Sequence, residues 1–213
     1  EPVTGPTGAR GLVHPFYSKH IEHVVKTDKL GFQQAMNLFD QILSALSYAH
    51  NHKGFDGQLQ RTYHLHIHPC QVLVSDDLSD CKLVGLGYSQ VYRNLTRASK
   101  PRWQEPGMNP ATMPPEFFRS KAAKVRERHS EIYSLGVLLY FMATGEYPFE
   151  GPSFEDFKFQ HSRIQPSPPT LTDSSLPPWL DRIVLGCLEK DPEKRWDTVT
   201  ELHAEFRTAR LTS

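Results

Sequence analysis

The stretch that decides the fold lies between residues 64 and 74, where three alternating histidines lead into a short apolar run: His64-Leu65-His66-Ile67-His68-Pro69-Cys70-Gln71-Val72-Leu73-Val74. A second apolar run, residues 81–84, leads into the turn 85–87, which contains two glycines. The intervening residues 75–80 are rich in serine and aspartate, as is typical of a hairpin loop. We therefore predict a small β-hairpin that follows a histidine-rich loop.

Helical patterns surround this hairpin on both sides. Apolar residues recur at steps of three and four between residues 32 and 49, which predicts an amphipathic helix. Residues 132–143 are apolar on nearly every side, which predicts a buried central helix. Two more amphipathic patterns predict helices near residues 180–188 and 199–209. Segments without a period are predicted to be loops: 1–11, 88–113 and 165–178.

Composition narrows the class of protein. A chain of 213 residues is long enough for one domain or one large lobe. Lys+Arg and Asp+Glu both number 24, and this balance argues against binding to nucleic acid or to an anionic membrane surface. The three cysteines lack paired spacing, so we expect no disulfide framework and a cytoplasmic setting. No apolar run is long enough for membrane insertion.

The order of these motifs resembles the C-terminal lobe of a eukaryotic-type protein kinase. Met113-Pro114-Pro115-Glu116 resembles the Ala-Pro-Glu motif, and residues 187–196 resemble the Cys-Leu-x-x-Asp-Pro-x-x-Arg signature. Further segments that match are 41–50, 131–137 and 145–149. The resemblance implies a mainly α, kinase-like C-lobe over residues 12–213, with a small β-hairpin at the active site. Residues 1–11 would be a linker or boundary segment, and the N-lobe would be absent.

The resemblance assigns the site to three segments: the catalytic loop 64–74, the metal-binding turn 85–87 and the activation segment 88–116. His66 stands where the family has the catalytic Asp, Gln71 where it has the metal-binding Asn, and Gly85 where it has the metal-binding Asp. Magnesium prefers several hard oxygen ligands, which this set lacks. The chain also has no Gly-rich loop and no place for the strand Lys. The resemblance therefore implies a pseudokinase rather than an enzyme, with no cofactor.

Other positions imply a retained framework. Glu116 and Arg195 match the buried ion pair that ties the activation segment to the lower helices, and Glu131 matches the residue that anchors the catalytic loop. Leu65 replaces an Arg that often pairs with an activation-loop phosphate. Residues 55–63 are longer than the usual link, and one hypothesis is that they fold over the site.

These features predict a protein-interaction, scaffolding or regulatory module in signalling. We expect a protein partner, another domain or a homodimer mate to cover the face that an N-lobe would occupy, around Phe16, Tyr17, Leu73 and Leu86. The alternative is a divergent phosphotransferase whose N-lobe comes from upstream sequence or from another chain.

The histidines suggest a third function. His64, His66 and His68 would share one face of an extended segment and are candidate ligands of a metal-dependent switch. The simpler interpretation, which we favour, is that they are ordinary loop residues. His20 and His23 lie beside Glu22 on a helical segment, where we expect them to be solvated.

Overall fold

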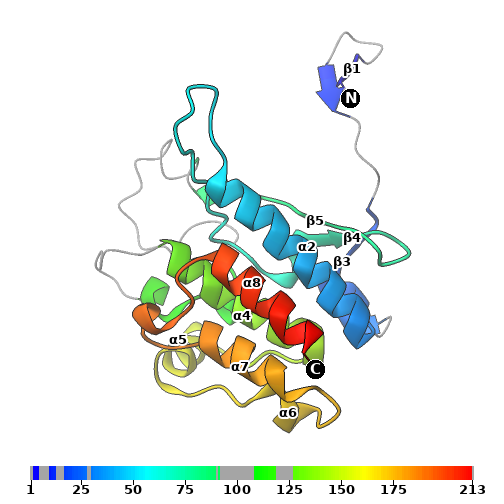
Figure 1. Ribbon diagram of the computed structural model, residues 1–213. Coiled ribbons are helices and arrows are strands. Elements are labelled where there is room, and N and C mark those ends of the chain that lie inside the picture. Colours follow the sequence, from blue (N-terminus) through cyan, green and yellow to red (C-terminus); the bar gives the residue numbers. More distant parts are fainter. Residues whose placement is uncertain are drawn as a thin grey trace.

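The structure is a computed structural model, and it describes residues 2–4, 10–12, 17–27, 30–89, 91, 108–118 and 127–212. Helices make up most of it, as predicted (Figure 1). The α-helices are α1 Ile21–Thr27, α2 Phe32–Asn51, α4 Glu127–Thr144, α5 Phe154–Arg163, α6 Pro169–Thr172, α7 Pro178–Cys187 and α8 Val199–Leu211. Short 3-10 helices are η1 Pro69–Gln71, η3 Pro110–Thr112, η4 Pro115–Phe118 and η5 Pro192–Lys194. The strands are β1 Pro2–Thr4, β2 Arg10–Leu12, β3 Lys19–His20, β4 Val72–Val74 and β5 Cys81–Leu83.

Helix α4 forms the centre of the core. Its residues from His129 to Met142 are all buried, as the nearly continuous apolar pattern predicts. Close packing against α7 depends on Gly136, because a Cβ at that position would lie 2.5 Å from the Cβ of Cys187. Helices α2 and α7 pack against α4, and α8 packs in turn against α2 and α7.

Helices α2 and α8 lie side by side although most of the sequence separates them (Figure 1). The rings of Phe39 and Phe206 meet edge to face, with centroids 5.2 Å apart. At the surface, Arg207 donates two hydrogen bonds to Asp40, at 2.7 and 2.8 Å. An aromatic contact and an ion pair therefore join the first long helix to the last one.

The predicted hairpin is one part of a larger sheet. Strands β4 and β5 pair antiparallel, and β3 adds a third strand in the order β3-β4-β5, with His20 opposite Leu73. The prediction of a lone hairpin is wrong because a strand of two residues leaves no alternation for the sequence to display. The prediction of a loop over residues 1–11 is also wrong, since β1 and β2 pair with each other there.

Two further loop predictions need correction. Helix α6 lies inside residues 165–178, because Pro169 occupies its first position, where proline is well tolerated. In the described part of residues 88–113, η3 forms a turn whose Ala111 N–H bonds to the side chain of Asn109. Phe16 and most of the activation segment 88–116 lie outside the described residues.

Two predictions from composition can be compared with the structure. The three cysteines are free, which confirms the prediction that they form no disulfide framework. Among the described helices, none combines the length and apolar character needed to cross a membrane.

Candidate active site

The loop of residues 64–71, here called the histidine loop, links the sequence after α2 to strand β4 and is held in place by Glu131. The Glu131 carboxylate is fully buried and accepts hydrogen bonds from the backbone N–H groups of His64, at 2.5 Å, and Leu65, at 2.9 Å. Its other oxygen lies 2.7 Å from His50 Nε2. A buried carboxylate therefore fixes the start of the loop, in the anchoring role that the sequence assigned to Glu131.

Leu65 shows how firmly this anchor holds the backbone. Its φ of 63° is in the left-handed region, which costs a residue with a Cβ about 1–3 kcal/mol. The bond to Glu131 and the packing of the Leu65 side chain with Met113, Phe117 and Phe118 offset that cost. The Leu65 side chain therefore packs in an apolar cluster. It carries no charge and offers no partner to an activation-loop phosphate.

His64 is a structural residue. Its Nε2 donates a hydrogen bond to Val84 O at 2.7 Å, and its Nδ1 accepts one from the N–H of His66 at 3.3 Å. Burial lowers the pKa of His64, in agreement with a neutral ring. Both ring nitrogens are engaged, so the three histidines of the loop do not make the metal site considered from the sequence.

His66 and Gln71 lie in the histidine loop, and Gly85 lies in the turn after β5. His66 is buried, and its ring meets the Tyr88 ring edge to face, with centroids 5.5 Å apart. Gln71 O accepts the Val84 N–H at 2.9 Å, which ties η1 to the end of β5. A Cβ at Gly85 would lie 3.6 Å from Gln71 Nε2, so the two metal-ligand positions of the family are neighbours here.

This donor set does not fit magnesium. Gly85 offers no side chain, and Gln71 offers one amide oxygen, Oε1, which is buried without a hydrogen-bond partner among the described residues. Magnesium takes near-octahedral oxygen coordination, usually with one or more carboxylates. We therefore derive no step through a magnesium ion held by these residues.

The segment 110–118 is fixed by a buried ion pair. Arg195 donates to both oxygens of Glu116, at 2.8 and 3.0 Å, and Ser130 donates to the same carboxylate at 2.6 Å. Burial alone would raise the pKa of Glu116, but the bonds from Arg195 and Ser130 outweigh it, and the net shift is downward. Thr112 O also accepts a bond from Ser134 of α4 at 2.8 Å. The pairing of Glu116 with Arg195 is as the sequence implied.

The hypothesis that residues 55–63 cover the site is wrong. Phe55 at the tip is fully exposed, and Leu59 is largely exposed. The loop projects away from the helices (Figure 1). Only Thr62 approaches the turn, since its methyl group would lie 3.2 Å from a Cβ at Gly87.

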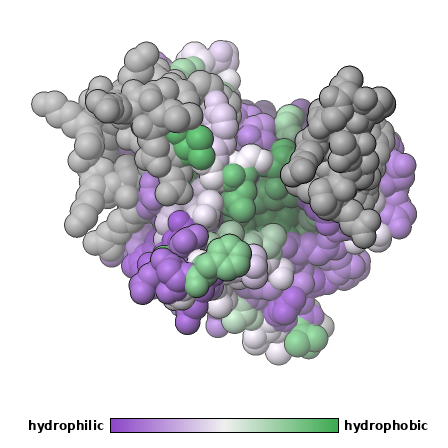
Figure 2. All heavy atoms as spheres, turned by 90° about the horizontal axis from the view of Figure 1, so that it is seen from above, coloured by the Kyte–Doolittle hydropathy of each residue, from purple (hydrophilic) through white to green (hydrophobic). Residues whose placement is uncertain are grey.

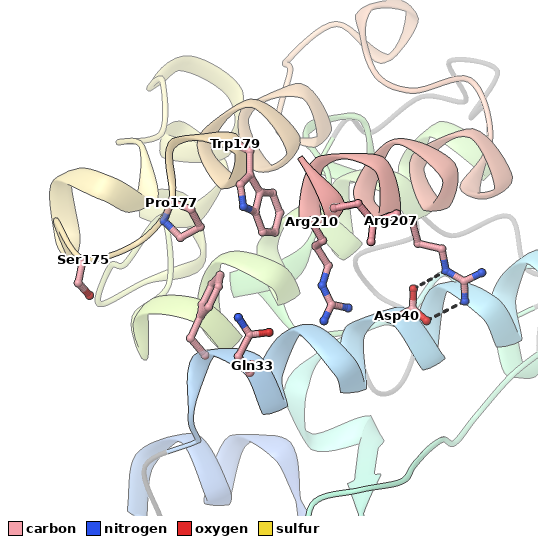
Figure 3. Close-up of a pocket in the computed structure, with 9 residues that line it drawn as sticks. Gln33, Asp40, Ser175, Pro177, Trp179, Arg207 and Arg210 are labelled. Carbon is pink, nitrogen blue, oxygen red and sulfur yellow. Dashed lines mark hydrogen bonds and ion pairs between the residues drawn. The ribbon is translucent and has the colours of Figure 1, made fainter. Parts of the chain in front are cut away.

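A separate cavity of about 600 Å³ lies between α2, α7 and α8 (Figure 3). Asp40 at its edge is bonded to Arg207 and lies 3.0 Å from His203 Nε2. These contacts lower the pKa of Asp40, the bond from Arg207 being the largest cause. Because its charge is balanced by close neighbours, Asp40 belongs to the joint between α2 and α8.

Sequence reasoning missed His50 as a partner of Glu131. The two residues are 81 positions apart, and a histidine at the end of an amphipathic helix gives no sign of a buried carboxylate. Ser130 was missed for the same reason, since a serine in an apolar helix does not indicate its acceptor.

The fold and the anchored loop define the helical lobe of a protein-kinase-type domain. The family model described as "Protein kinase domain" matches residues 12–206, and the chain belongs to this family. The serine/threonine-protein kinase PknB of Mycolicibacterium smegmatis is 27% identical over 187 residues, which cover 87% of this chain and 28% of that protein. The serine/threonine-protein kinase PrkC of Bacillus subtilis is 25% identical over 190 residues, which cover 88% of this chain and 27% of that protein.

Two further matches are with another curated protein kinase and with a solved structure. The serine/threonine-protein kinase PknB of Mycobacterium tuberculosis is 40% identical over 92 residues, which cover 43% of this chain and 14% of that protein. The crystal structure of Rad53 1-466 in complex with AMP-PNP has a TM-score of 0.66 and 20% identity, and the match covers 92% of this chain and 45% of that chain. This last likeness supports the fold alone. The chain spans under a third of the length of the curated relatives named here.

These comparisons correct one prediction. The sequence suggested a pseudokinase and not an enzyme, because His66, Gln71 and Gly85 replace the catalytic and metal-binding residues. The relatives that match most of the chain are named serine/threonine-protein kinases, and they point to an enzyme.

Proposed function

We propose that this chain is the helical lobe of a serine/threonine-type phosphotransferase, and that further sequence or another chain supplies its nucleotide-binding lobe. The anchored histidine loop is the observation that carries the proposal. Glu131 holds the backbone at His64 and Leu65 and so sets the position of His66, the next residue. Positioning of the reacting groups, together with electrostatic stabilisation, is most of what a protein contributes to phosphoryl transfer.

In this proposal His66 accepts the proton of the substrate hydroxyl. An imidazole is a competent general base near neutral pH, and a positioned base contributes about 10²–10⁴-fold to a rate. The ion pair of Glu116 with Arg195 keeps segment 110–118 in a fixed place relative to α4. Because Gln71 and Gly85 do not fit magnesium, the charge of the phosphoryl group has to be neutralised by groups other than a magnesium ion held by these two residues.

The test is phosphoryl transfer from labelled ATP by the protein with its natural flanking sequence. We expect His66→Ala to reduce the initial rate by at least about 100-fold. The matched control is His52→Ala, because His52 is exposed just beyond the end of α2. Equal rates in H66A and wild type, or no transfer by the wild-type protein, would contradict the proposal.

A second candidate function is that of a docking module in signalling. Four large hydrophobic residues after β5 are exposed: Val84, Leu86, Tyr88 and Val91. Figure 2 shows hydrophobic surface gathered on the face seen from above. Adjacent exposed apolar side chains of this kind often mark an interaction surface. We propose that a second lobe, a protein partner or a homodimer mate covers them.

Hydrogen exchange tests this second function. Amides of residues 84–91 should exchange more slowly in the full-length protein than in this chain alone, because a covered surface opens less often. Identical exchange in both would refute docking of a second lobe of the same protein at this face. We also propose a reducing, cytoplasmic setting, which the three free cysteines support.

A further inference from the structure

A second group of reactive side chains lies where strand β3 and helix α1 meet the histidine loop. His20, Glu22 and Cys70 each offer one ligand atom, and these three atoms all lie within 4.8 Å of one another. His20 is the last residue of β3, Glu22 is in the first turn of α1, and Cys70 is in the middle of η1. The pairing of β3 with β4 brings these segments together, since η1 leads directly into β4.

The contacts inside this group are close. Cys70 Sγ lies 2.5 Å from Glu22 Oε2, which is shorter than an ordinary hydrogen bond. The other Glu22 oxygen accepts a bond from Lys26 Nζ at 2.8 Å. His20 Nδ1 accepts a long bond of 3.2 Å from the backbone N–H of His23, so its lone pair is only weakly used. Each of the three residues therefore has a donor atom facing the same small space.

His68 is a further nitrogen donor in the histidine loop, two residues before Cys70. Its Nδ1 is buried and has no hydrogen-bond partner among the described residues. A buried ring nitrogen without a partner is costly unless something binds it.

Nitrogen, carboxylate oxygen and sulfur together are a donor set that suits zinc. In a tetrahedral zinc site the ligand atoms lie roughly 3.3–3.6 Å apart, given Zn–N of about 2.0–2.1 Å and Zn–S of about 2.3 Å. In this group Cys70 Sγ and Glu22 Oε2 are 2.5 Å apart and no pair of ligand atoms is more than 4.8 Å apart, so small side-chain movements would bring the atoms into that range. We propose that His20, Glu22 and Cys70 form a zinc site with three protein ligands.

Binding replaces the thiol proton of Cys70 with the metal, and the proton leaves to solvent. Without metal the thiol is the stable form, because burial and then Glu22 raise the pKa of Cys70 to about 11. Glu22 also lines a cavity of about 670 Å³, together with Lys26 and Tyr147, which gives an ion a path from solvent. Lys26 is half exposed and can turn away from the incoming cation.

The consequence is a second anchor for the histidine loop. Glu131 holds the loop at its start, whereas zinc would hold it at its end and join it to β3 and α1. His66 lies between the two anchors. Zinc would thus limit the motion of His66 by holding the end of the loop that follows it, whereas Glu131 holds the end that precedes it. The site is independent of whether the proposed phosphoryl transfer takes place.

Cobalt is a suitable probe, since it substitutes for zinc and its thiolate complexes absorb in the near ultraviolet. We expect one equivalent of Co²⁺ to give this absorption in the wild-type chain and zinc to remove it. Cys70→Ser should abolish the absorption, and Glu22→Gln should weaken cobalt binding at least about tenfold. The matched control is Cys81→Ala, because Cys81 is buried away from the group and its thiol bonds to Leu38 O. An absorption that survives in C70S, or is absent from the wild type, would overturn the proposal.

A second measurement does not depend on the folding of a variant. Cys70 is partly exposed, whereas Cys81 and Cys187 are buried, so an alkylating reagent reaches Cys70 first. Zinc should slow alkylation of Cys70 in the wild-type chain by at least about tenfold. Equal rates with and without zinc, measured by mass spectrometry, would also refute the site.

Discussion

Replacing Glu116 with Gln should destabilise the protein severely, because it removes the charge of a buried ion pair and keeps its volume. The Arg195 side chain is fully buried, and that of Glu116 is 8% exposed. Besides two bonds to Glu116, Arg195 donates to His129 O at 2.9 Å and to Glu189 O at 2.8 Å, so it cannot turn towards water without breaking the turn around it.

The size of the effect follows from this burial. Removing one partner of a buried ion pair costs about 3–5 kcal/mol, because the other charge stays buried. For a chain of this length that loss lowers the Tm by about 6–20 °C. The net pKa of Glu116 is lowered in the folded state, so its stabilising effect is present above the unfolded pKa and is lost as pH falls through the folded one.

Urea denaturation at several pH values measures both effects. The difference between wild type and E116Q should be large at pH 7 and shrink in acid. The control is Glu205→Gln, because Glu205 pairs with Arg182 at 3.2 Å with both side chains exposed, and such pairs contribute only about 0–1 kcal/mol. If E116Q costs no more than E205Q, the reasoning about the buried pair is wrong.

Three further outcomes can be measured. Glu131→Ala should cost about 3 kcal/mol and speed hydrogen exchange at the His64 amide, and unchanged exchange there would refute the anchor. Gly136→Ala should cost about 1–3 kcal/mol in urea, since its Cβ would meet that of Cys187 at 2.5 Å, and shortening Cys187 to Gly in the same chain should recover part of the loss. Burial lowers the pKa of His161 from 6.5 to about 3. As pH drops below 6.5, His161 of the unfolded chain therefore takes up a proton before that of the folded chain, and the free energy of unfolding falls. His161→Asn should make this fall with pH less steep, and an unchanged slope would contradict the argument.

The helices were the most predictable part of the fold. Helix α4 could be recognised because its apolar residues leave almost no polar face. Its start could not, because the first residues of the helix include His129, Ser130 and Glu131, which are polar but buried. Strand β3 has two residues, too few for any period to appear.

The position of the candidate site could be predicted from the sequence, but its activity could not. The motif order predicts that Gln71 and Gly85 lie close together, and in the structure a Cβ at Gly85 would lie 3.6 Å from Gln71 Nε2. The same replacements were interpreted as loss of activity, and the comparisons with named kinases contradict that interpretation. Cys70 and Glu22 are 48 positions apart, so their contact appears only after the sheet has formed.

The packing of α2 against α8 has a consequence for how this protein is made. The apolar face of α2, which includes Phe39, is covered by Phe206 of α8, a helix that the ribosome adds well after α2. Because contacts between residues so distant in the sequence form late, the apolar face of α2 stays uncovered until α8 has been synthesised. We expect nascent chains that lack α8 to bind chaperones, and the synthesis of α8 to end that binding.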